Sequence, residues 1–392
     1  MFVNIFPVLF YLFYVIEFLL MTDNKTAILK VGIIILTLNR PDFVIRQLKY
    51  YAKLNSPHPV YISDAGNDEN SKKLQSFIEK IDKDLTIFYY RHPKPAYSMV
   101  DSYVNLYDKV REKYCVFSGD DDYQIPRSLI KCAEFLENNP DYSNASGYAV
   151  SFRLVNNGVY GVLNRLADYP RRQIESSSAA NRLMDFMSRY YVPLFSVYRT
   201  EEIKKCWSQS GVLKDWDFSN EILASARALI LGKSKIIDCL SFVRQIHNIQ
   251  YQSLDTFDWI MSPDWHSSFE SFIKILTEEI AAADNIGVDE ARQVVKEASW
   301  RYLVRRLSKE YADKYGESAV IPTIQNRAMP YFKIIKFKIS KKLPWLKNFY
   351  RQRIRPLTKA LPQIHDDVLR KGSKYYDDFK PVMNSFTDHN SI

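Results

Sequence analysis

Three consecutive aspartates, Asp120, Asp121 and Asp122, follow an apolar run in the segment CVFSGDDDYQIP (residues 115–126). Adjacent carboxylates repel one another, so three in a row are expected either in a solvated turn or around a cation. Mg²⁺ and Mn²⁺ prefer carboxylate and phosphate oxygens as ligands. An EF-hand is excluded, because no Gly and Glu follow at the sixth and twelfth loop positions. The residue types therefore leave two interpretations, a solvated turn and a site for a hard divalent cation.

Polar side chains follow each of four apolar runs in the first third of the chain. The runs are KVGIIILTL (30–38), PVYIS (59–63), LTIFYY (85–90) and YCVFS (114–118). Short, continuous runs of this kind predict strands that are buried on both faces of a parallel sheet. Ligands bind beyond the carboxyl ends of such strands. The polar residues found there are Asn39, Arg40 and Asp42, then Asp64 and Asp68, then Arg91, His92 and Lys94, and finally the three aspartates. Their convergence predicts a binding site at one sheet edge.

Helical periods separate these strands, which makes the predicted fold class α/β. Apolar residues recur at helical spacing within 44–51, 74–81 and 100–107, and Pro41 stands at a first helical turn. No Gly-rich phosphate loop of the form GxGxxG or GxxxxGK[ST] follows the first strand. Its absence from the sequence argues against a dinucleotide-dependent dehydrogenase and a P-loop NTPase.

The composition is that of a folded globular protein. The 392 residues are 46% hydrophobic and 25% charged, with 11 Gly, which argues against a disordered or fibrous chain and predicts one large domain with additional structure, or two domains. The four cysteines are scattered without metal-ligand spacing, so we expect reduced thiols in a cytosolic compartment.

Two segments suggest contact with a membrane. Residues 1–21 are apolar and are interpreted either as a membrane anchor or as the product of a wrongly assigned start, with Met21 as the alternative. Lys25 and Lys30 follow this segment, so the positive-inside rule keeps the downstream chain in the cytoplasm. Residues 327–360 hold eleven Lys or Arg and no Asp or Glu, and subtracting these from the net charge of +9 leaves −2. This basic, amphipathic segment favours an anionic membrane surface, with a nucleic-acid surface and a solvated helical face as alternatives.

Three segments in this order, IIILTLNRPDFVIRQL, YISDAGNDENS and YCVFSGDDDYQIP, resemble the inverting glycosyltransferases of the GT-A fold, family 2 type. The resemblance covers about residues 30–250. It implies a GT-A-like domain over 28–250 with a mostly parallel sheet flanked by helices. The resemblance also implies a divalent metal cofactor, Mn²⁺ or Mg²⁺. The remaining residues, 251–392, resemble no family, and their own sequence predicts a mostly helical C-terminal region.

The resemblance assigns roles to the strand-end residues. Leu38, Asn39 and Arg40 match the first-strand loop that lines the nucleotide, and Asp64 matches the aspartate that contacts the base. The acidic motif of the family has the form D-x-D-D-x-x-x-P. Counting back from Pro126 makes Asp121 the metal ligand, with Asp122 beside it, and puts Gly119 where the first Asp normally stands. Asp120 is then expected to take over the ribose or sugar contact, and the register Asp120/Asp122 is the open alternative.

A second signature of the family is similar to DWDFSNEILASARALILGKSKIIDCLSFVRQIH (residues 215–247). Its spacing from Gly232 makes Glu221 the catalytic base, with Asp217, four residues earlier on the same helical face, as the alternative. The strand that follows ends near Arg244, which is expected to contact the diphosphate. His247 stands where a late histidine completes the metal shell.

The sequence thus predicts a metal-dependent, inverting glycosyltransferase. It would move a sugar from a nucleoside diphosphate sugar, UDP-sugar first, to a hydroxyl of a glycan, a polysaccharide or a lipid-linked saccharide. The alternatives are a sugar-nucleotide nucleotidyltransferase and a non-catalytic protein that binds membranes or nucleic acid through basic residues. For the leading interpretation we expect association with the cytoplasmic face of the membrane and no nucleic-acid partner.

Overall fold

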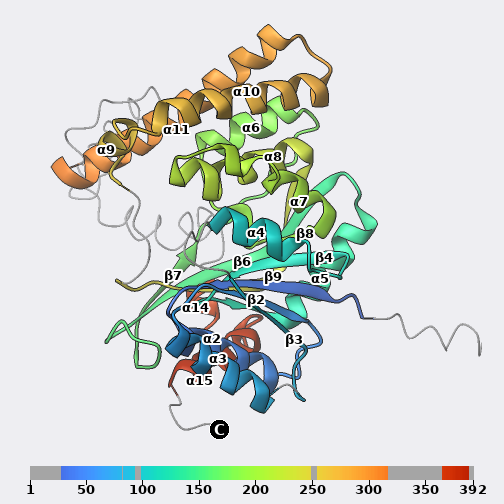
Figure 1. Ribbon diagram of the computed structural model, residues 1–392, viewed down its shortest axis with the longest axis vertical. Coiled ribbons are helices and arrows are strands. Elements are labelled where there is room, and N and C mark those ends of the chain that lie inside the picture. Colours follow the sequence, from blue (N-terminus) through green and yellow to red (C-terminus); the bar gives the residue numbers. More distant parts are fainter. Residues whose placement is uncertain (1–27, 82, 93–98, 249–253, 317–363, 388–392) are drawn as a thin grey trace, which may run out of the picture.

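The computed structural model describes residues 28–81, 83–92, 99–248, 254–316 and 364–387. They form one sheet with helices on both of its faces (Figure 1). The apolar segment 1–21 and the basic segment 327–360 lie outside the described residues, so the expectations for both remain predictions. Within the described ranges, none of the helices combines the length and the hydropathy needed to cross a bilayer.

The sheet has nine strands within the described residues, in the order β3-β2-β1-β4-β8-β6-β9-β5, with β7 paired to β6. The strands are β1 (Val31–Thr37), β2 (Val60–Asp64), β3 (Ile87–Arg91), β4 (Tyr114–Gly119), β5 (Tyr123–Gln124), β6 (Tyr142–Leu154), β7 (Leu163–Tyr169), β8 (Val197–Arg199) and β9 (Lys233–Gln245). Their pairings make β1 to β4, β6 and β9 run in one direction and β5, β7 and β8 in the other. The predicted α/β fold with a mostly parallel sheet is therefore confirmed.

The four predicted strands all form, and β1 shows why their sequences are apolar throughout. Successive side chains of a strand point to opposite faces. Ile33 and Ile35 of β1 belong to the core on one face, whereas Ile34 and Leu36 belong to the core on the other. Strand β3 differs from the prediction, because it is the edge strand and is only half-buried along its length.

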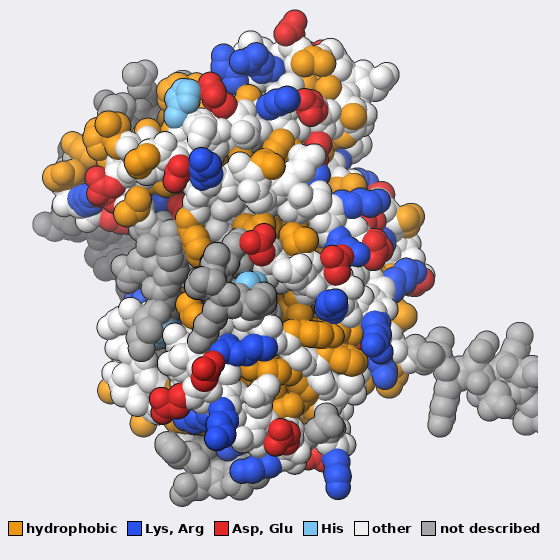
Figure 2. Space-filling view, in the orientation of Figure 1, with side chains coloured by type: hydrophobic (Ala, Val, Ile, Leu, Met, Phe, Trp, Pro, Cys, Tyr) orange, Lys and Arg blue, Asp and Glu red, His pale blue; other side chains and the backbone are white. Residues whose placement is uncertain are grey.

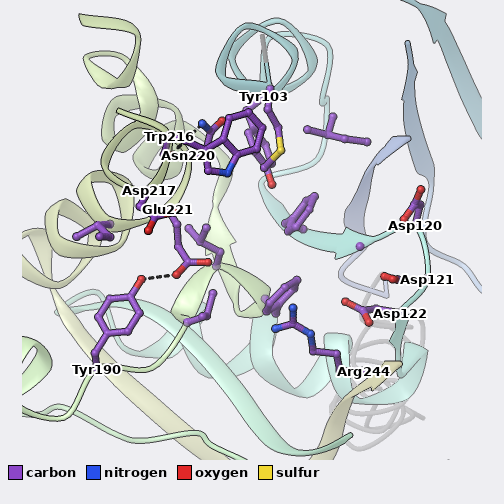
Figure 3. Close-up of a pocket in the computed structure, with 18 of the residues that line it drawn as sticks. Tyr103, Asp120, Asp121, Asp122, Tyr190, Trp216, Asp217, Asn220, Glu221 and Arg244 are labelled. Carbon is purple, nitrogen blue, oxygen red and sulfur yellow. Dashed lines mark hydrogen bonds between the residues drawn. The ribbon is translucent and has the colours of Figure 1, made fainter. Parts of the chain in front are cut away.

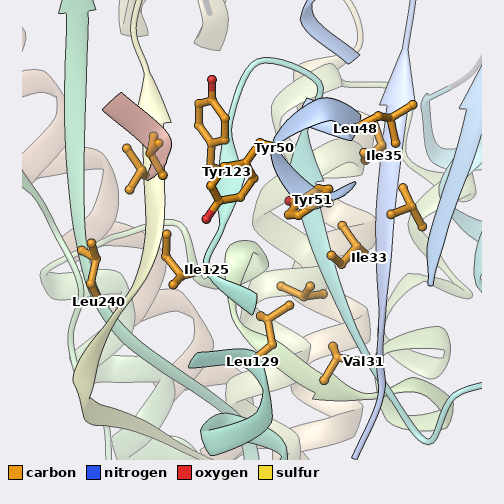
Figure 4. Packing of buried hydrophobic residues seen from close by; sticks show 14 of the residues in the cluster. Val31, Ile33, Ile35, Leu48, Tyr50, Tyr51, Tyr123, Ile125, Leu129 and Leu240 are labelled. Atoms are coloured by element: carbon orange, nitrogen blue, oxygen red, sulfur yellow. The ribbon is translucent and has the colours of Figure 1, made fainter. Parts of the chain in front are cut away.

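Helices from both ends of the chain cover the first face of the sheet. They are α2 (Pro41–Lys53), α3 (Asp68–Ile81), α5 (Pro126–Asn138), α14 (Ile364–Asp367) and α15 (Tyr376–Thr387). Figure 4 shows the core beneath them, where Ile33 and Ile35 of β1 lie near Leu48 and Tyr51 of α2. The C-terminal helix α15 packs on α2, and its Phe379 and Phe386 are fully buried in the same core.

The second face of the sheet carries α4 (Met99–Tyr107), α7 (Thr200–Trp207) and α8 (Leu223–Leu231). Beyond them lie α6 (Ala179–Ser188), α9 (Thr256–Ile260), α10 (Trp265–Asp284) and α11 (Val288–Tyr315), which share a separate core (Figure 1). The helical C-terminal extension predicted from the sequence is thus present, and its described parts lie on opposite sides of the sheet.

A buried histidine joins β1 to the start of α5. The Nδ1 atom of His58 accepts a hydrogen bond from the Val31 amide at 3.0 Å, and its Nε2 atom lies 2.9 Å from the Pro126 carbonyl oxygen. A neutral imidazole protonated at Nε2 satisfies both contacts. Burial lowers the pKa of His58 from 6.5 to about 4.

We predict that His58 makes the free energy of unfolding decrease as the pH falls, which means that the folded protein becomes less stable. Its pKa is lower in the folded than in the unfolded chain, so the unfolded chain takes up the proton first. The stabilisation is complete above pH 6.5 and is lost progressively as the pH falls towards 4. The full effect amounts to at most about 3 kcal/mol. Denaturant unfolding at pH 7, 6 and 5 measures it.

The His58→Gln variant is the comparison. It should be less stable than the parent at pH 7, because the two buried hydrogen bonds are weakened. Its stability should also change less between pH 6.5 and pH 5. Parallel pH profiles for the two proteins would show that His58 does not cause this dependence.

Candidate active site

The three aspartates, here called the acidic loop (Asp120–Asp122), lie at the carboxyl end of β4. The last residue of that strand, Gly119, pairs with Leu36 near the end of β1, so the loops after β1 and β4 meet as predicted. The three residues are only 6%, 5% and 2% exposed. This degree of burial excludes the solvated turn, because carboxylates are buried only where they have partners.

Each carboxylate of the acidic loop has a different set of partners. Asp120 accepts a hydrogen bond from the Thr37 hydroxyl at 2.9 Å and lies 3.2 Å from Nη1 of Arg40. Asp121 Oδ2 lies 2.7 Å from Nη2 of Arg40 and 2.7 Å from Nε2 of His247. Asp122 Oδ1 accepts a hydrogen bond from the Gln245 amide of β9 at 3.0 Å. The loop is therefore tied to β1 on one side and to β9 on the other.

Two side chains of helix α2 donate hydrogen bonds to the backbone of the acidic loop. Arg46, fully buried, donates to the Asp121 carbonyl at 2.7 Å and to Gln245 Oε1 at 2.6 Å. Gln47 donates to the carbonyls of Gly119, at 2.6 Å, and Asp122. Sequence analysis missed both residues. The available signal was a pair of polar residues within the first turns of a helix that follows a strand-end loop.

Charge repulsion remains inside the loop. Burial and the neighbouring Asp121 carboxylate raise the pKa of Asp120 and of Asp122. The guanidinium groups of Arg40 and Arg244 oppose these increases in pKa. Both pKa values stay raised despite these arginines, so negative charge is in excess and the site attracts further positive charge.

The metal ligands predicted from the sequence are only partly brought together. Asp121 and His247, 126 positions apart in the sequence, have Oδ2 and Nε2 in contact, and Nη2 of Arg40 lies 3.0 Å from the same Nε2. Asp122 instead directs one oxygen to the β9 backbone. In the part of the chain that the structure describes, no three His, Cys, Asp or Glu residues form a group that could hold a metal. Carboxylate and imidazole are nevertheless ligand types that Mn²⁺ accepts, so Asp121 and His247 fit a metal whose remaining ligands come from a substrate.

The acidic loop opens into a pocket of about 1130 Å³ that Leu38, Asn39 and Arg40 also line. Figure 3 shows the acidic loop on one wall, Asp217 and Glu221 on the opposite wall, and Arg244 between them. The two walls come from distant parts of the sequence, which the sheet topology brings to one edge.

Glu221 lies in a π-helical turn, Phe218–Ile222, directly before α8. Such turns are rare and recur at functional sites. The side chain accepts a hydrogen bond from the Tyr190 hydroxyl at 2.6 Å, drawn as a dashed line in Figure 3. Burial raises the pKa of Glu221 above 4.5. A carboxylate whose pKa is closer to neutrality is a stronger base.

Asp217, the alternative base, has a cationic partner. Its Oδ2 atom lies 3.0 Å from Nη1 of Arg306, which comes from α11. Glu221 is therefore the better placed candidate, because its side chain accepts its hydrogen bond from the uncharged phenol of Tyr190. Sequence analysis could not find Tyr190 or Arg306, since neither lies near the signature segment.

Arg244 approaches the centre of the pocket from the end of β9. Its Nη1 atom donates to the Tyr169 hydroxyl at 2.7 Å, and its guanidinium lies over the rings of Tyr169 and Phe195. These contacts fix the orientation of a cation that faces both walls (Figure 3). An arginine held in this way suits phosphate oxygens, which it can bind with two parallel hydrogen bonds.

The residues predicted to bind the nucleotide base lie at the ends of β1 and β2. Leu38 and Asn39 line the pocket. Asn39 has a positive φ of 57°, and its Oδ1 accepts a hydrogen bond from the Asn67 amide at 2.6 Å, which joins the two strand-end loops. Asp64 is 2% exposed and accepts hydrogen bonds from the Gly66 amide and the Tyr89 hydroxyl, both at 2.7 Å. It does not line the pocket formed by the described residues, and its contact with a base stays a prediction.

Gly119 explains the departure from the D-x-D-D pattern. A Cβ atom at this position would lie 2.7 Å from Asp122 Oδ2 and 2.9 Å from Asp121 Oδ1. Both carboxylates fold back over the glycine, and both are fixed by other partners. An aspartate at position 119 would therefore displace the rest of the loop.

We predict that Gly119→Ala destabilises the protein by about 1–3 kcal/mol, because the new methyl group displaces two anchored carboxylates. Denaturant unfolding measures the change. Gly211→Ala is the matched control, since nothing lies within 4 Å of its Cβ position, and it should be neutral or slightly stabilising. Equal effects of the two substitutions would contradict the crowding described here.

No protein-family model matches the chain, and no curated protein matches it either. Among solved structures it is similar to TarS of S. aureus, with 16% identity, a TM-score of 0.46 and coverage of 76% of this chain and 46% of TarS, so it spans about half the length of that protein. It is also similar to TarS 1–349 in complex with UDP-GlcNAc, with 14% identity, a TM-score of 0.45 and coverage of 76% of this chain and 77% of that one. A third similar structure is the mannosyltransferase PcManGT of Pyrobaculum calidifontis in complex with GDP-Man and Mn²⁺. Its identity is 12% and its TM-score is 0.39, with coverage of 82% of this chain and 83% of that one.

Proposed function

We propose that this protein is a glycosyltransferase of the GT-A type. It transfers a sugar from a nucleoside diphosphate sugar to an acceptor hydroxyl, with inversion at the anomeric carbon. The observation that carries the proposal is the two-walled pocket, in which a buried acidic loop faces the half-buried carboxylate of Glu221 with Arg244 between them. A transfer of this kind needs a leaving diphosphate on one side of the sugar and a base on the other.

The acidic-loop wall is the donor side. Asp121 and His247 would hold Mn²⁺ or Mg²⁺, and a bound divalent cation would supply positive charge against the diphosphate. Arg244 points to the same region and would bind the phosphate oxygens, while Arg40 keeps the acidic loop paired. Leu38 and Asn39, at the mouth of this wall, would contact the nucleoside.

The Glu221 wall is the acceptor side. The hydroxyl of the acceptor attacks the anomeric carbon, the bond from that carbon to the diphosphate oxygen breaks, and Glu221 takes up the hydroxyl proton. Tyr190 orients the carboxylate through its 2.6 Å hydrogen bond. Trp216, which is 39% exposed in the same wall, presents an aromatic surface on which a sugar ring can stack. The expected acceptor is therefore a saccharide, either free or lipid-linked.

Ligand-dependent thermal stability tests the proposal. UDP with Mn²⁺ should raise the melting temperature, and EDTA should abolish the increase, because ligands that bind only the folded state stabilise it. Stabilisation by a nucleoside triphosphate but not by the diphosphate would instead indicate a nucleotidyltransferase. No stabilisation by any nucleotide would argue against both enzymes. A panel of radiolabelled nucleotide sugars would then identify the donor.

We predict that Asp121→Asn weakens Mn²⁺-dependent binding of UDP by about 10-fold or more, because a neutral amide is a poor ligand for a hard dication. Isothermal titration with and without Mn²⁺ measures the effect. Asp42→Asn is the matched control, since the Asp42 side chain is 51% exposed and pairs with Lys73, and it should bind as the parent does. A larger loss of Mn²⁺-dependent UDP binding in Asp122→Asn than in Asp121→Asn would assign the metal contact to Asp122.

We predict that Glu221→Gln lowers kcat by roughly 10²-fold or more and leaves the affinity for the donor unchanged, since only proton transfer is lost. Because burial raises the pKa of Glu221 above 4.5, the parent should lose activity as the pH falls through that raised pKa. The variant should lack this acid limb. If Asp217→Asn lowers kcat and removes the acid limb of the pH profile, and Glu221→Gln does neither, Asp217 is the base.

A further inference from the structure

Helix α11 carries a line of exposed apolar side chains. They are Trp300, Val304, Leu307, Tyr311 and Tyr315, which are 64%, 48%, 37%, 46% and 68% exposed. Their spacing of four, three, four and four residues places all five on one face of the helix. Single exposed apolar residues are common on protein surfaces, whereas a continuous line of them marks an interaction site. We call this line the α11 stripe.

The α11 stripe is separate from the faces that the fold uses. Val295, Ala298 and Tyr302 are buried in the core shared with α6 and α10. Tyr302, Arg306, Lys309 and Asp313 recur at helical spacing and line the pocket. One face of the helix therefore packs in its first half and lines the pocket in its second half, and the stripe lies on the opposite face.

Helix α9 extends the apolar surface. Phe257 and Met261 are 70% and 73% exposed, and α9 is joined to α11 by an ion pair between Asp255 and Lys314 at 2.9 Å. Figure 2 shows hydrophobic side chains gathered where α9 and the end of α11 lie. Exposed cationic residues, Arg301 and Arg305, stand on the helix beside the stripe.

We propose that the α11 stripe docks on an anionic lipid membrane. Tryptophan and tyrosine rings favour the headgroup layer of a bilayer, and neighbouring arginines and lysines bind lipid phosphates. The charge along the chain supports the same partner, because the basic segment 327–360, with eleven Lys or Arg and no acid, begins twelve residues after Tyr315. Cations of this kind are attracted to an anionic leaflet.

The stripe and the pocket-lining residues lie on opposite faces of α11, so docking would hold the pocket one helix diameter, roughly 10 Å, from the membrane surface. This consequence rests on the proposed function: the acceptor would be a lipid-linked saccharide that need not leave the bilayer. The docking itself requires neither donor nor catalysis and can fail or succeed independently.

A fluorescent label on the stripe tests the proposal. All four native cysteines are buried, so Val304→Cys in the full chain can be labelled selectively with an environment-sensitive dye. Val155→Cys, at an exposed position in the β6–β7 turn, is the control. Vesicles containing about 30% phosphatidylserine should shift the emission of the dye at 304 to the blue and leave the dye at 155 unchanged. Neutral vesicles should give a smaller shift, and salt should weaken the effect.

Every other result overturns the proposal. No shift at 304 with protein bound to the vesicles places the membrane contact elsewhere. A shift that grows with protein concentration without vesicles assigns the stripe to a second copy of the chain. Emission of the dye at 304 that is blue-shifted before vesicles are added, and does not change when they are added, would show that another segment of the same chain covers the stripe.

Substitution of the stripe gives an independent measurement. The triple variant Val304→Gln, Leu307→Gln and Tyr311→Gln should bind the anionic vesicles about 10-fold or more weakly in flotation, since it removes three apolar side chains from the contact with the membrane. The matched triple variant at the exposed positions Val155, Val162 and Leu231 should bind as the parent does. Equal binding by the two triple variants would overturn the proposal, whether or not either transfers sugar.

Discussion

Burial of three adjacent carboxylates at the end of β4 is the constraint around which this structure is organised. Removing one ionised carboxylate from water without partners costs several kcal/mol, and neighbouring like charges add to that cost. The partners come from three directions. Arg40 and Thr37 reach the loop from the end of β1, Arg46 and Gln47 reach it from α2, and the backbone of β9 reaches it from the other side. The order of the strands and the position of α2 on the sheet are therefore both needed to bring these partners to the three carboxylates.

This arrangement also sets the chemistry of the pocket. Arg40 offsets negative charge on one side of the acidic loop, so a metal held by Asp121 and His247 would enter a site already partly neutralised. Arg244 is fixed by aromatic rings and a tyrosine hydroxyl, and its charge acts on Asp122 of the acidic loop. The same charge faces the pocket, which Arg244 lines. Glu221, on the opposite wall, is half-buried beside a phenol, so under the proposed function the two walls would act separately on a leaving group and on an attacking hydroxyl.

The sequence was sufficient for features that depend on local patterns. The four strands, the loops at their ends and the segment from Asp217 to His247 each carry a short signature, and the parallel-sheet rule brings them to one edge. It was insufficient for the groups that stabilise the site, because Arg46, Gln47 and Tyr190 act through contacts made only in the folded chain. The role of Gly119 also needed coordinates, since the missing aspartate is explained by the direction in which two carboxylates fold back.

The region after residue 250, which resembles no family by sequence, completes the pocket. Arg306 of α11 neutralises Asp217, one of two carboxylates that could serve as the base, and thereby distinguishes their environments. Helix α15 closes the opposite side of the sheet, where its buried rings pack beneath α2, the helix that holds the acidic loop. A change in these C-terminal helices would therefore alter both walls of the pocket without touching a signature residue. Under the proposed function, buried charge constrains the donor wall, whereas the acceptor wall is shaped in part by α11, so changes in α11 would alter the acceptor contacts while the charge arrangement stays the same.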